Sequence, residues 1–227
     1  MAIVIYTKED RINISKAKLE KNPWDSSYVV NIKRKMKNEK RLIQGEVCCY
    51  CLRDTLGEGG FALHLEHILP KGVFGIYIFD LANIAVSCVR CNMEIKRRDY
   101  SFLDENLHEC AKNKWSHKVY DSKNYAIVHP NLDSAREHID IVSLRVDGKK
   151  FCFYKKKTKK GEATFRYFKL KQMEIDDLDI LQGISVSNPG GAVPEIVERI
   201  FDEATDSESG NKVIGDTHQF MDTIQDR

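Results

Sequence analysis

Three short stretches decide the fold of this chain: CCYC at 48–51, HLEHILPK at 64–71 and LANIAVSCVRCNMEIK at 81–96. The first and the third each hold a Cys-x-x-Cys pair, formed by Cys48 with Cys51 and by Cys88 with Cys91. A two-residue spacer lets both thiolates of a pair reach one tetrahedral Zn²⁺ ion, and two pairs supply all four ligands. One pair could arise by chance or serve redox chemistry. Two pairs predict a closed, structural zinc site.

Side chains suited to hydrolysis lie between and beside these pairs. Glu66 and His67 stand near the end of a strand expected over 61–69. Phosphodiester hydrolysis needs a base for water and a cation beside the phosphate. His67 can be the base because imidazole titrates near neutral pH, and Asn83 could fix the orientation of its ring. Glu66 and Asn92 offer the hard oxygen ligands that Mg²⁺ takes.

In order and spacing, the three stretches resemble the zinc-knuckle HNH endonucleases, which have a ββα-metal active site. The resemblance covers residues 46–98 and places the HNH letters on His67, Asn83 and Asn92. It implies an α+β protein with a treble-clef-like ββα-metal core, a structural Zn²⁺ ion and a catalytic Mg²⁺ or Mn²⁺ ion. The implied activity is metal-dependent cleavage of nucleic acid, with DNA favoured over RNA.

Within that resemblance, the catalytic residues are His67, Asn83, Asn92 and Glu66, and Glu66 and Asn92 also hold the catalytic magnesium. Glu66 stands where the family frequently has Asp. Neighbouring strand residues point to opposite faces, so Glu66 and His67 can share a site only if the strand is bent or bulged there.

Four cations near these residues are candidate phosphate contacts: Lys71, Arg90, Lys96 and Arg97. Lys96 and Arg97 end a helix expected over 88–98, where cations also complement the helix dipole. Both roles are compatible.

Charge is divided unevenly along the 227 residues. Residues 1–173 hold 33 Lys and Arg against 21 Asp and Glu, a net of +12, whereas residues 174–227 hold 3 against 13, a net of −10. A basic body favours a polyanion such as nucleic acid. No stretch approaches the roughly 18 apolar residues of a membrane helix, and the N-terminal MAIVIY run does not read as a secretory signal. The expected location is the cytoplasm.

Four regions follow from these patterns: a basic helical region (1–45), the HNH core (46–107), a β-rich extension (108–180) and an acidic helical tail (181–227). In the first, a helix is expected over 27–42. In the third, strands are expected at 125–128, 139–146, 150–154 and 164–170. Asp147-Gly148 indicates a two-residue hairpin turn.

Beyond the core, HPNLD at 129–133 resembles an element of bacterial defence nucleases, including Septu-type HNH proteins that act beside an ABC-type ATPase. A role in antiviral defence and an ATPase partner follow as expectations from this resemblance. A capped turn is the alternative reading of the segment around His129. The tail offers an apolar docking stripe: Ile196, Val197, Ile200 and Phe201.

Two other functions fit the same residues. The chain could be a metal-dependent RNase, for example one directed at tRNA. It could also be a zinc module that binds nucleic acid or protein without catalysis.

Overall fold

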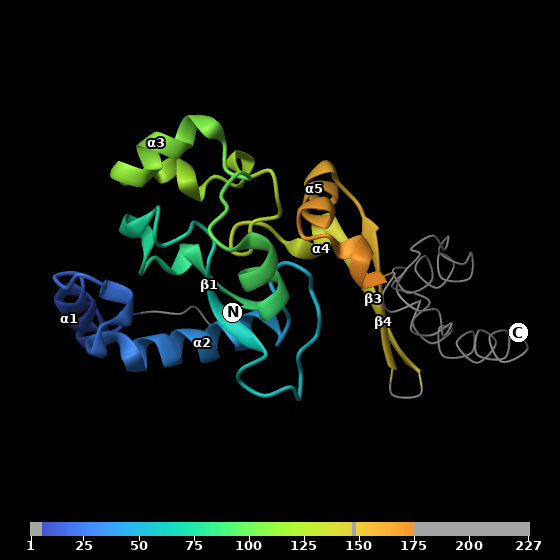
Figure 1. Ribbon diagram of the computed structural model, residues 1–227, viewed down its shortest axis with the longest axis horizontal. Coiled ribbons are helices and arrows are strands. Elements are labelled where there is room, and N and C mark those ends of the chain that lie inside the picture. Colours follow the sequence, from blue (N-terminus) through green and yellow to red (C-terminus); the bar gives the residue numbers. More distant parts are fainter. Residues whose placement is uncertain (1–5, 147–148, 175–227) are drawn as a thin grey trace, which may run out of the picture. The chain divides into compact units, whose positions relative to one another are not determined.

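The computed structural model describes residues 6–146 and 149–174 (Figure 1). These residues form two compact units. The first contains residues 6–139 and 156–168, and the second contains residues 140–155 and 169–174. The docking stripe and the turn at 147–148 that the sequence suggests lie outside the described residues.

The first unit begins with two helices whose ends follow from local capping. Helix α1 (Lys8–Ala17) starts with a capping box, in which the Thr7 hydroxyl and the Asp10 carboxylate each accept the other residue's backbone N–H. After two 3₁₀ turns, η1 (Pro23–Asp25) and η2 (Ser27–Val29), helix α2 (Val30–Gln44) runs to Gly45, which ends it at a φ of +69°. The helix expected over 27–42 is confirmed with a 3₁₀ start.

A two-stranded antiparallel sheet lies at the centre of the first unit. Strand β1 (Leu63–His67) pairs with β2 (Ile84–Cys88) in unbroken register, with Glu66 opposite Ala85 and His67 opposite Ile84. The ladder therefore contains no bulge, and the side chains of Glu66 and His67 leave β1 on opposite faces. The bend or bulge considered from the sequence does not occur.

Short turns join and follow these strands. The 3₁₀ turns η3 (Gly75–Tyr77) and η4 (Leu81–Asn83) carry the chain from β1 to β2, and η5 (Arg90–Lys96) is a π-helix. The apolar sequence at 74–78 allows an inward-packed loop or a strand, and the structure has the 3₁₀ turn η3 there, with Phe74 and Tyr77 buried.

Helix α2 packs against both strands, and helix α1 packs against the 3₁₀ turns before α2, so that one apolar cluster joins these elements. Its buried members are Ile14, Ala17, Val29, Ile32, Met36, Ile78, Phe79 and Ile84. Ile32 and Met36 lie on the core face of α2. Lys40 follows them on that face, 6% exposed, and its ammonium donates to the Leu81 carbonyl and to the Asn131 side-chain oxygen, both at 2.9 Å.

The rest of the first unit is mainly helical: α3 (Glu105–Asn113), η6 (His117–Tyr120), η7 (Ser122–Asn124), α4 (Ala135–His138) and α5 (Lys159–Tyr167). The strand expected at 164–170 is wrong, because the Thr158 side chain accepts the Gly161 N–H and starts a helix whose inner face buries Thr164 and Phe165. The strand expected at 125–128 is also wrong. Tyr125 makes only an isolated bridge with Leu103.

The second unit contains the predicted hairpin. Strand β3 (Ile139–Val146) pairs with β4 (Lys149–Lys156) in a two-stranded sheet. Near the far end of β4, the Tyr154 N–H donates to the Glu174 carboxylate at 2.7 Å. The overall class is α+β, as expected, although the extension is β-rich only in this hairpin. None of the described helices is long and apolar enough to span a membrane.

Candidate functional site

The four cysteines of the two pairs come together as one buried cluster. Their sulfur atoms all lie within 4.8 Å of one another, and among the described residues this is the one group of three or more His, Cys, Asp or Glu side chains placed to hold a metal. Cys51 and Cys88 are separated by 3.8 Å between sulfurs. A tetrahedral Zn²⁺ ion with Zn–S bonds of ~2.3 Å requires sulfurs ~3.8 Å apart. A disulfide needs only ~2.05 Å.

A backbone hydrogen bond also stabilises a thiolate in this cluster. The Cys88 N–H donates to the Cys48 sulfur at 3.3 Å, which favours the thiolate that a metal requires. All four side chains are buried, so water has no direct path to an ion between them. The cluster could therefore hold a metal such as zinc in a closed, structural site.

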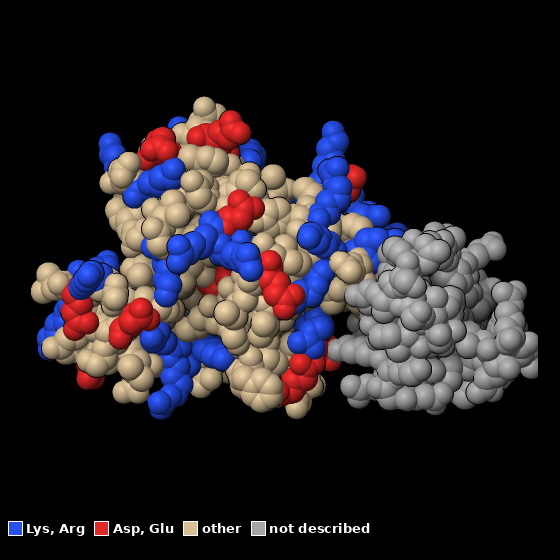
Figure 2. Space-filling view, in the orientation of Figure 1, with Lys and Arg blue, Asp and Glu red and all other residues tan. Residues whose placement is uncertain are grey.

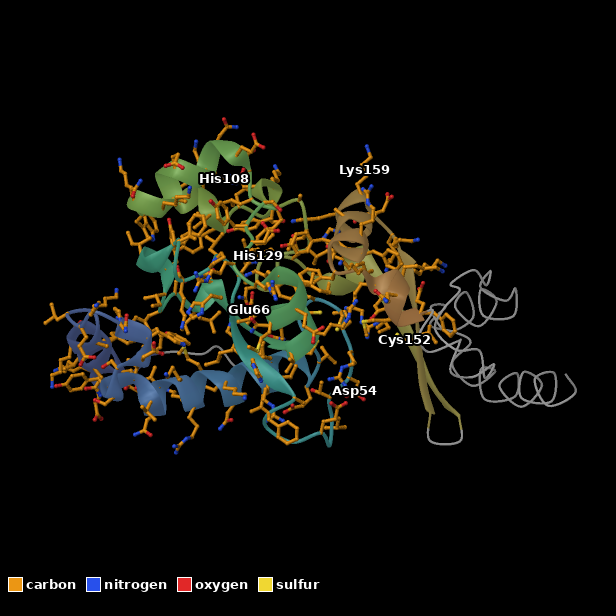
Figure 3. The ribbon with its side chains drawn as sticks, viewed as in Figure 1. Asp54, Glu66, His108, His129, Cys152 and Lys159 are labelled. Carbon is orange, nitrogen blue, oxygen red and sulfur yellow. The ribbon has the colours of Figure 1, made fainter. Side chains whose placement is uncertain are left out.

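Glu66 is buried beside the cysteine cluster and is already paired. Its Oε1 atom lies 2.7 Å from the Lys96 ammonium and accepts the Tyr50 hydroxyl at 3.1 Å. Figure 3 shows Glu66 in the interior of the first unit. Burial raises the pKa of Glu66, and Lys96 and Tyr50 oppose that rise. An added cation at Glu66 would have to displace or share this ammonium.

Lys96 does not lie where the sequence suggested. Only 1% of the residue is exposed, and its ammonium also donates to the His67 carbonyl at 2.9 Å. The π-helix explains the difference. Its i→i+5 hydrogen bonds, such as Arg97 N–H to the Asn92 carbonyl, bring Cys91 and Lys96 to the same buried face. The expected phosphate contact at Lys96 is therefore corrected to a buried ion pair.

His67 occupies the opposite face of β1 in a fixed orientation. Its Nε2 atom lies 3.0 Å from the Ile78 carbonyl, which can only accept, so Nε2 carries the hydrogen and Nδ1 keeps a lone pair. The ring also packs edge-on against Trp24, with centroids 4.3 Å apart. Burial lowers the pKa of His67 to about 4, so the imidazole is neutral at pH 7. A neutral imidazole with a defined lone pair has the form of a general base.

Asn83 acts on this arrangement through the backbone. Its Oδ1 atom accepts the Leu69 N–H at 2.6 Å, and its amide nitrogen donates to the carbonyls of Leu69 and Tyr77 at 3.1 and 3.2 Å. These bonds close the segment that ends at Ile78, the partner of His67. Asn83 is therefore a positioning residue, where the sequence suggested a direct contact with the imidazole.

We expect Asn83→Ala to lower the free energy of unfolding by about 1–3 kcal/mol, because it leaves the buried backbone N–H and C=O of Leu69 without the partners that Asn83 supplies. Urea denaturation would measure the loss. Asn131→Ala is the matched control. Its side-chain amide also bonds two backbone carbonyls, at Ala82 and Ile84, but not in the segment that leads to Ile78. Equal effects on a His67 readout, such as its NMR chemical shifts, would contradict a specific link from Asn83 to the imidazole.

Asn92 lies on η5, half-buried, with its amide nitrogen 3.5 Å from the Leu65 carbonyl on β1. Its amide oxygen and the Glu66 carboxylate are donors of the type that Mg²⁺ accepts. The chemistry of this donor pair fits a hard cation, whereas the carboxylate's existing bond to Lys96 opposes one.

The remaining candidate cations occupy different settings. Lys71 and Lys33 each place their ammonium 5.5 Å from the Trp24 ring centre, and Trp24 in turn packs on His67. Arg90 donates to the Phe168 carbonyl at 3.0 Å, and Arg97 is exposed with its Nε bonded to the Met93 carbonyl. In Figure 2 lysine and arginine side chains are scattered over a surface that is mostly uncharged, with acidic groups between them.

The HPNLD segment is a buried junction. The Asp133 carboxylate accepts from the His129 N–H at 2.7 Å, from the Lys160 ammonium at 2.5 Å and from the Ser122 hydroxyl. His129 is 3% exposed, its Nδ1 accepts the Asn131 N–H, and burial lowers its pKa to about 3. This is the capped turn that the sequence allowed as an alternative.

Three residues near the site carried no recognisable pattern in the sequence: Trp24, Lys33 and Tyr50. Trp24 and Lys33 come from the region before the first cysteine pair. Trp24, on η1, packs on His67, and Lys33, on α2, contacts Trp24. Tyr50 lies inside CCYC, and no sequence pattern assigns it a role. In the structure its hydroxyl donates to Glu66, and its ring stacks on Phe168 with centroids 4.2 Å apart.

Comparison with known proteins gives one curated relative. A stretch of 151 residues is 25% identical to the Septu protein PtuB of Bacillus thuringiensis, covering 66% of this chain and 44% of that protein. No protein-family profile and no solved structure matches. The chain is thus distantly similar to a Septu protein, spans less than half of its length, and carries a four-cysteine cluster suited to a metal such as zinc.

Proposed function

We propose that this chain is a metal-dependent HNH endonuclease that hydrolyses phosphodiester bonds of nucleic acid, with DNA the favoured substrate. The setting of His67 carries the proposal. Its tautomer is fixed by the Ile78 carbonyl, its charge is removed by burial, and two lysines lie over the neighbouring Trp24 ring. Phosphodiester hydrolysis requires a general base for the attacking water and positive charge near the phosphate.

In this proposal the four cysteines hold a structural Zn²⁺ ion, which fastens β2 and η5 to the CCYC turn. Glu66 and Asn92 are the proposed ligands of the Mg²⁺ or Mn²⁺ ion, which would supply charge stabilisation at the phosphate when bound. Because Glu66 leaves β1 on the face opposite His67 and is paired with Lys96, this role requires the carboxylate to leave Lys96 and the end of β1 to rearrange when the ion and the substrate bind. His67 accepts the proton of the attacking water at Nδ1. Asn83 keeps the Ile78 carbonyl in place, so the ring cannot turn its lone pair away.

The similarity to a Septu protein supports a place in anti-phage defence, and the resemblance of the HPNLD segment supports an ABC-type ATPase as partner. The basic body supports nucleic acid as the ligand, because positively charged surfaces gain affinity by releasing counterions from phosphates. An RNase of the same fold would use the same residues. Assaying DNA and RNA substrates side by side distinguishes it from a DNase.

Replacing His67 with alanine tests the proposal. We expect His67→Ala to reduce Mg²⁺-dependent cleavage by about 10²–10⁴-fold, the usual contribution of a general base. Plasmid DNA and total RNA serve as substrates, with the full chain assayed alone and together with the proposed ATPase partner. Zinc content and nucleic-acid affinity should stay unchanged.

His64→Ala is the matched control. His64 lies on the same strand, three residues away and half-buried, and should tolerate the change with cleavage intact. If wild type cleaves neither substrate in any of these assays and His67→Ala changes nothing measurable, the chain is a zinc module that binds without catalysis.

A further inference from the structure

A groove in the first unit is lined in part by residues of the segment 76–80, whose Ile78 carbonyl bonds His67. It has a volume of about 480 Å³ and is lined by Tyr6, Arg11, Ile14, Ser15, Lys18, Ile76, Phe79, Asp80 and Trp115. These residues come from α1 and its flanks, from the segment around η3, and from the chain just after α3. Pockets of ~300–1,000 Å³ accommodate small organic ligands.

Trp115 is an exposed aromatic ring at this groove. It is 54% exposed, yet its indole N–H donates to the Tyr120 hydroxyl at 3.3 Å. Tyr120 in turn donates to the Asp80 carboxylate, which also accepts the Ala82 N–H at 2.9 Å. This chain of hydrogen bonds fixes the indole without covering it. A fixed, uncovered ring is the feature on which nucleobases stack.

Positive charge enters the groove from helix α1. Arg11 and Lys18 both line it and are exposed, one at the start and one at the end of the helix face that also presents Ser15. Asp80 is the one acidic residue among the lining residues, and its carboxylate already accepts two hydrogen bonds. An aromatic platform beside two cations matches a nucleotide, with its base on the ring and its phosphate near the cations.

The groove and the imidazole share one piece of backbone. Ile76, Phe79 and Asp80 line the groove, while the carbonyl of Ile78 between them bonds His67. Phe79 also packs against Trp24 at 5.6 Å, and Trp24 packs on His67. A strand that reaches His67 can therefore continue across this segment to Trp115.

From these contacts we propose that the groove binds an unpaired nucleotide of a single-stranded nucleic acid, stacked on Trp115 with its phosphate held by Arg11 and Lys18. Its role as a substrate guide rests on the proposed nuclease function, but the binding itself does not. A free mononucleotide presents the same chemistry, and the experiment distinguishes the two.

The test measures binding of fluorescently labelled 12-nucleotide single strands to the full chain by anisotropy, without added Mg²⁺. We expect Trp115→Ala to weaken binding about 5- to 150-fold, which corresponds to the ~1–3 kcal/mol of one base–aromatic stack. Phe61→Ala is the control. Phe61 is 78% exposed and lies outside the groove, so its removal should leave the affinity unchanged.

The charge is tested separately. We expect Lys18→Ala to reduce the slope of log affinity against log salt by about 0.7, the value for one phosphate contact on a single strand. Lys8→Ala, an exposed lysine of the same helix outside the groove, should leave the slope unchanged.

Three outcomes would overturn the proposal: unchanged binding by Trp115→Ala, equal weakening by Phe61→Ala, or AMP that competes as strongly per molecule as the 12-mer. The last outcome would make the groove a mononucleotide site. Weaker binding by Trp115→Ala would support the groove even if the chain cleaves neither DNA nor RNA. Conversely, cleavage that depends on His67 but not on Trp115 would retain the nuclease and reject the groove.

Discussion

Removing the metal from the four-cysteine cluster should unfold the first unit. Structural zinc contributes on the order of 10 kcal/mol to small metal-bound folds, which is comparable to the whole ~5–15 kcal/mol stability of a typical domain. The cluster joins the CCYC turn to β2 and η5, the two elements that carry the residues around Glu66. We expect Cys51→Ser, or chelation of the wild type, to abolish cooperative thermal unfolding and to lower bound zinc below one equivalent.

Cys49→Ala is the control for this change. Cys49 is buried in the same turn but does not belong to the cluster. It should retain one zinc per chain and a cooperative transition. Circular dichroism follows the transition, and elemental analysis counts the metal. A Cys51→Ser protein that melts like the wild type would show that the four thiols are packing groups and not a metal site.

Lys96→Met should be the most destabilising single change outside the cysteines. The substitution keeps much of the side-chain volume but leaves the Glu66 carboxylate buried without its counter-charge. Breaking one side of a buried ion pair lowers the free energy of unfolding by about 3–5 kcal/mol. Urea denaturation would measure this loss.

The double variant Glu66→Gln with Lys96→Met is the matched control. It removes both charges and keeps an oxygen that accepts the Tyr50 hydroxyl, so we expect it to recover most of the stability. In the single variant the pKa of Glu66 rises further above its unfolded value. The loss is then small near pH 4, where the carboxyl is protonated in both states, and grows as the pH rises toward 8. A loss that is equal at both pH values, or no recovery in the double variant, would contradict the buried pair.

The sequence alone determined the local features of this protein. The helix expected over 27–42 is present because local groups define its ends: the Ser26 side chain accepts the Tyr28 N–H, and Gly45 takes a positive φ. Asp147-Gly148 stands between two strands as expected, although the second, Lys149–Lys156, is longer than the 150–154 predicted. The spacing of the cysteines also predicted one cluster, because a Cys-x-x-Cys pair fixes its two sulfurs within a single turn. Each of these features depends on interactions within a few residues, so the local sequence is enough to predict it.

Only the tertiary structure decided which partners the charged and aromatic residues meet. Lys96 appeared to be a surface cation because an α-helical period was assumed, and the π-helix turned it inward to Glu66. Trp24 reaches His67 from 43 positions earlier in the chain. At 164–170, the Thr158 cap and the burial of Thr164 and Phe165 within the first unit overrode a pattern that favours a strand. These outcomes depend on packing between segments that are distant in the sequence. Such contacts produce no local sequence pattern from which they could be predicted.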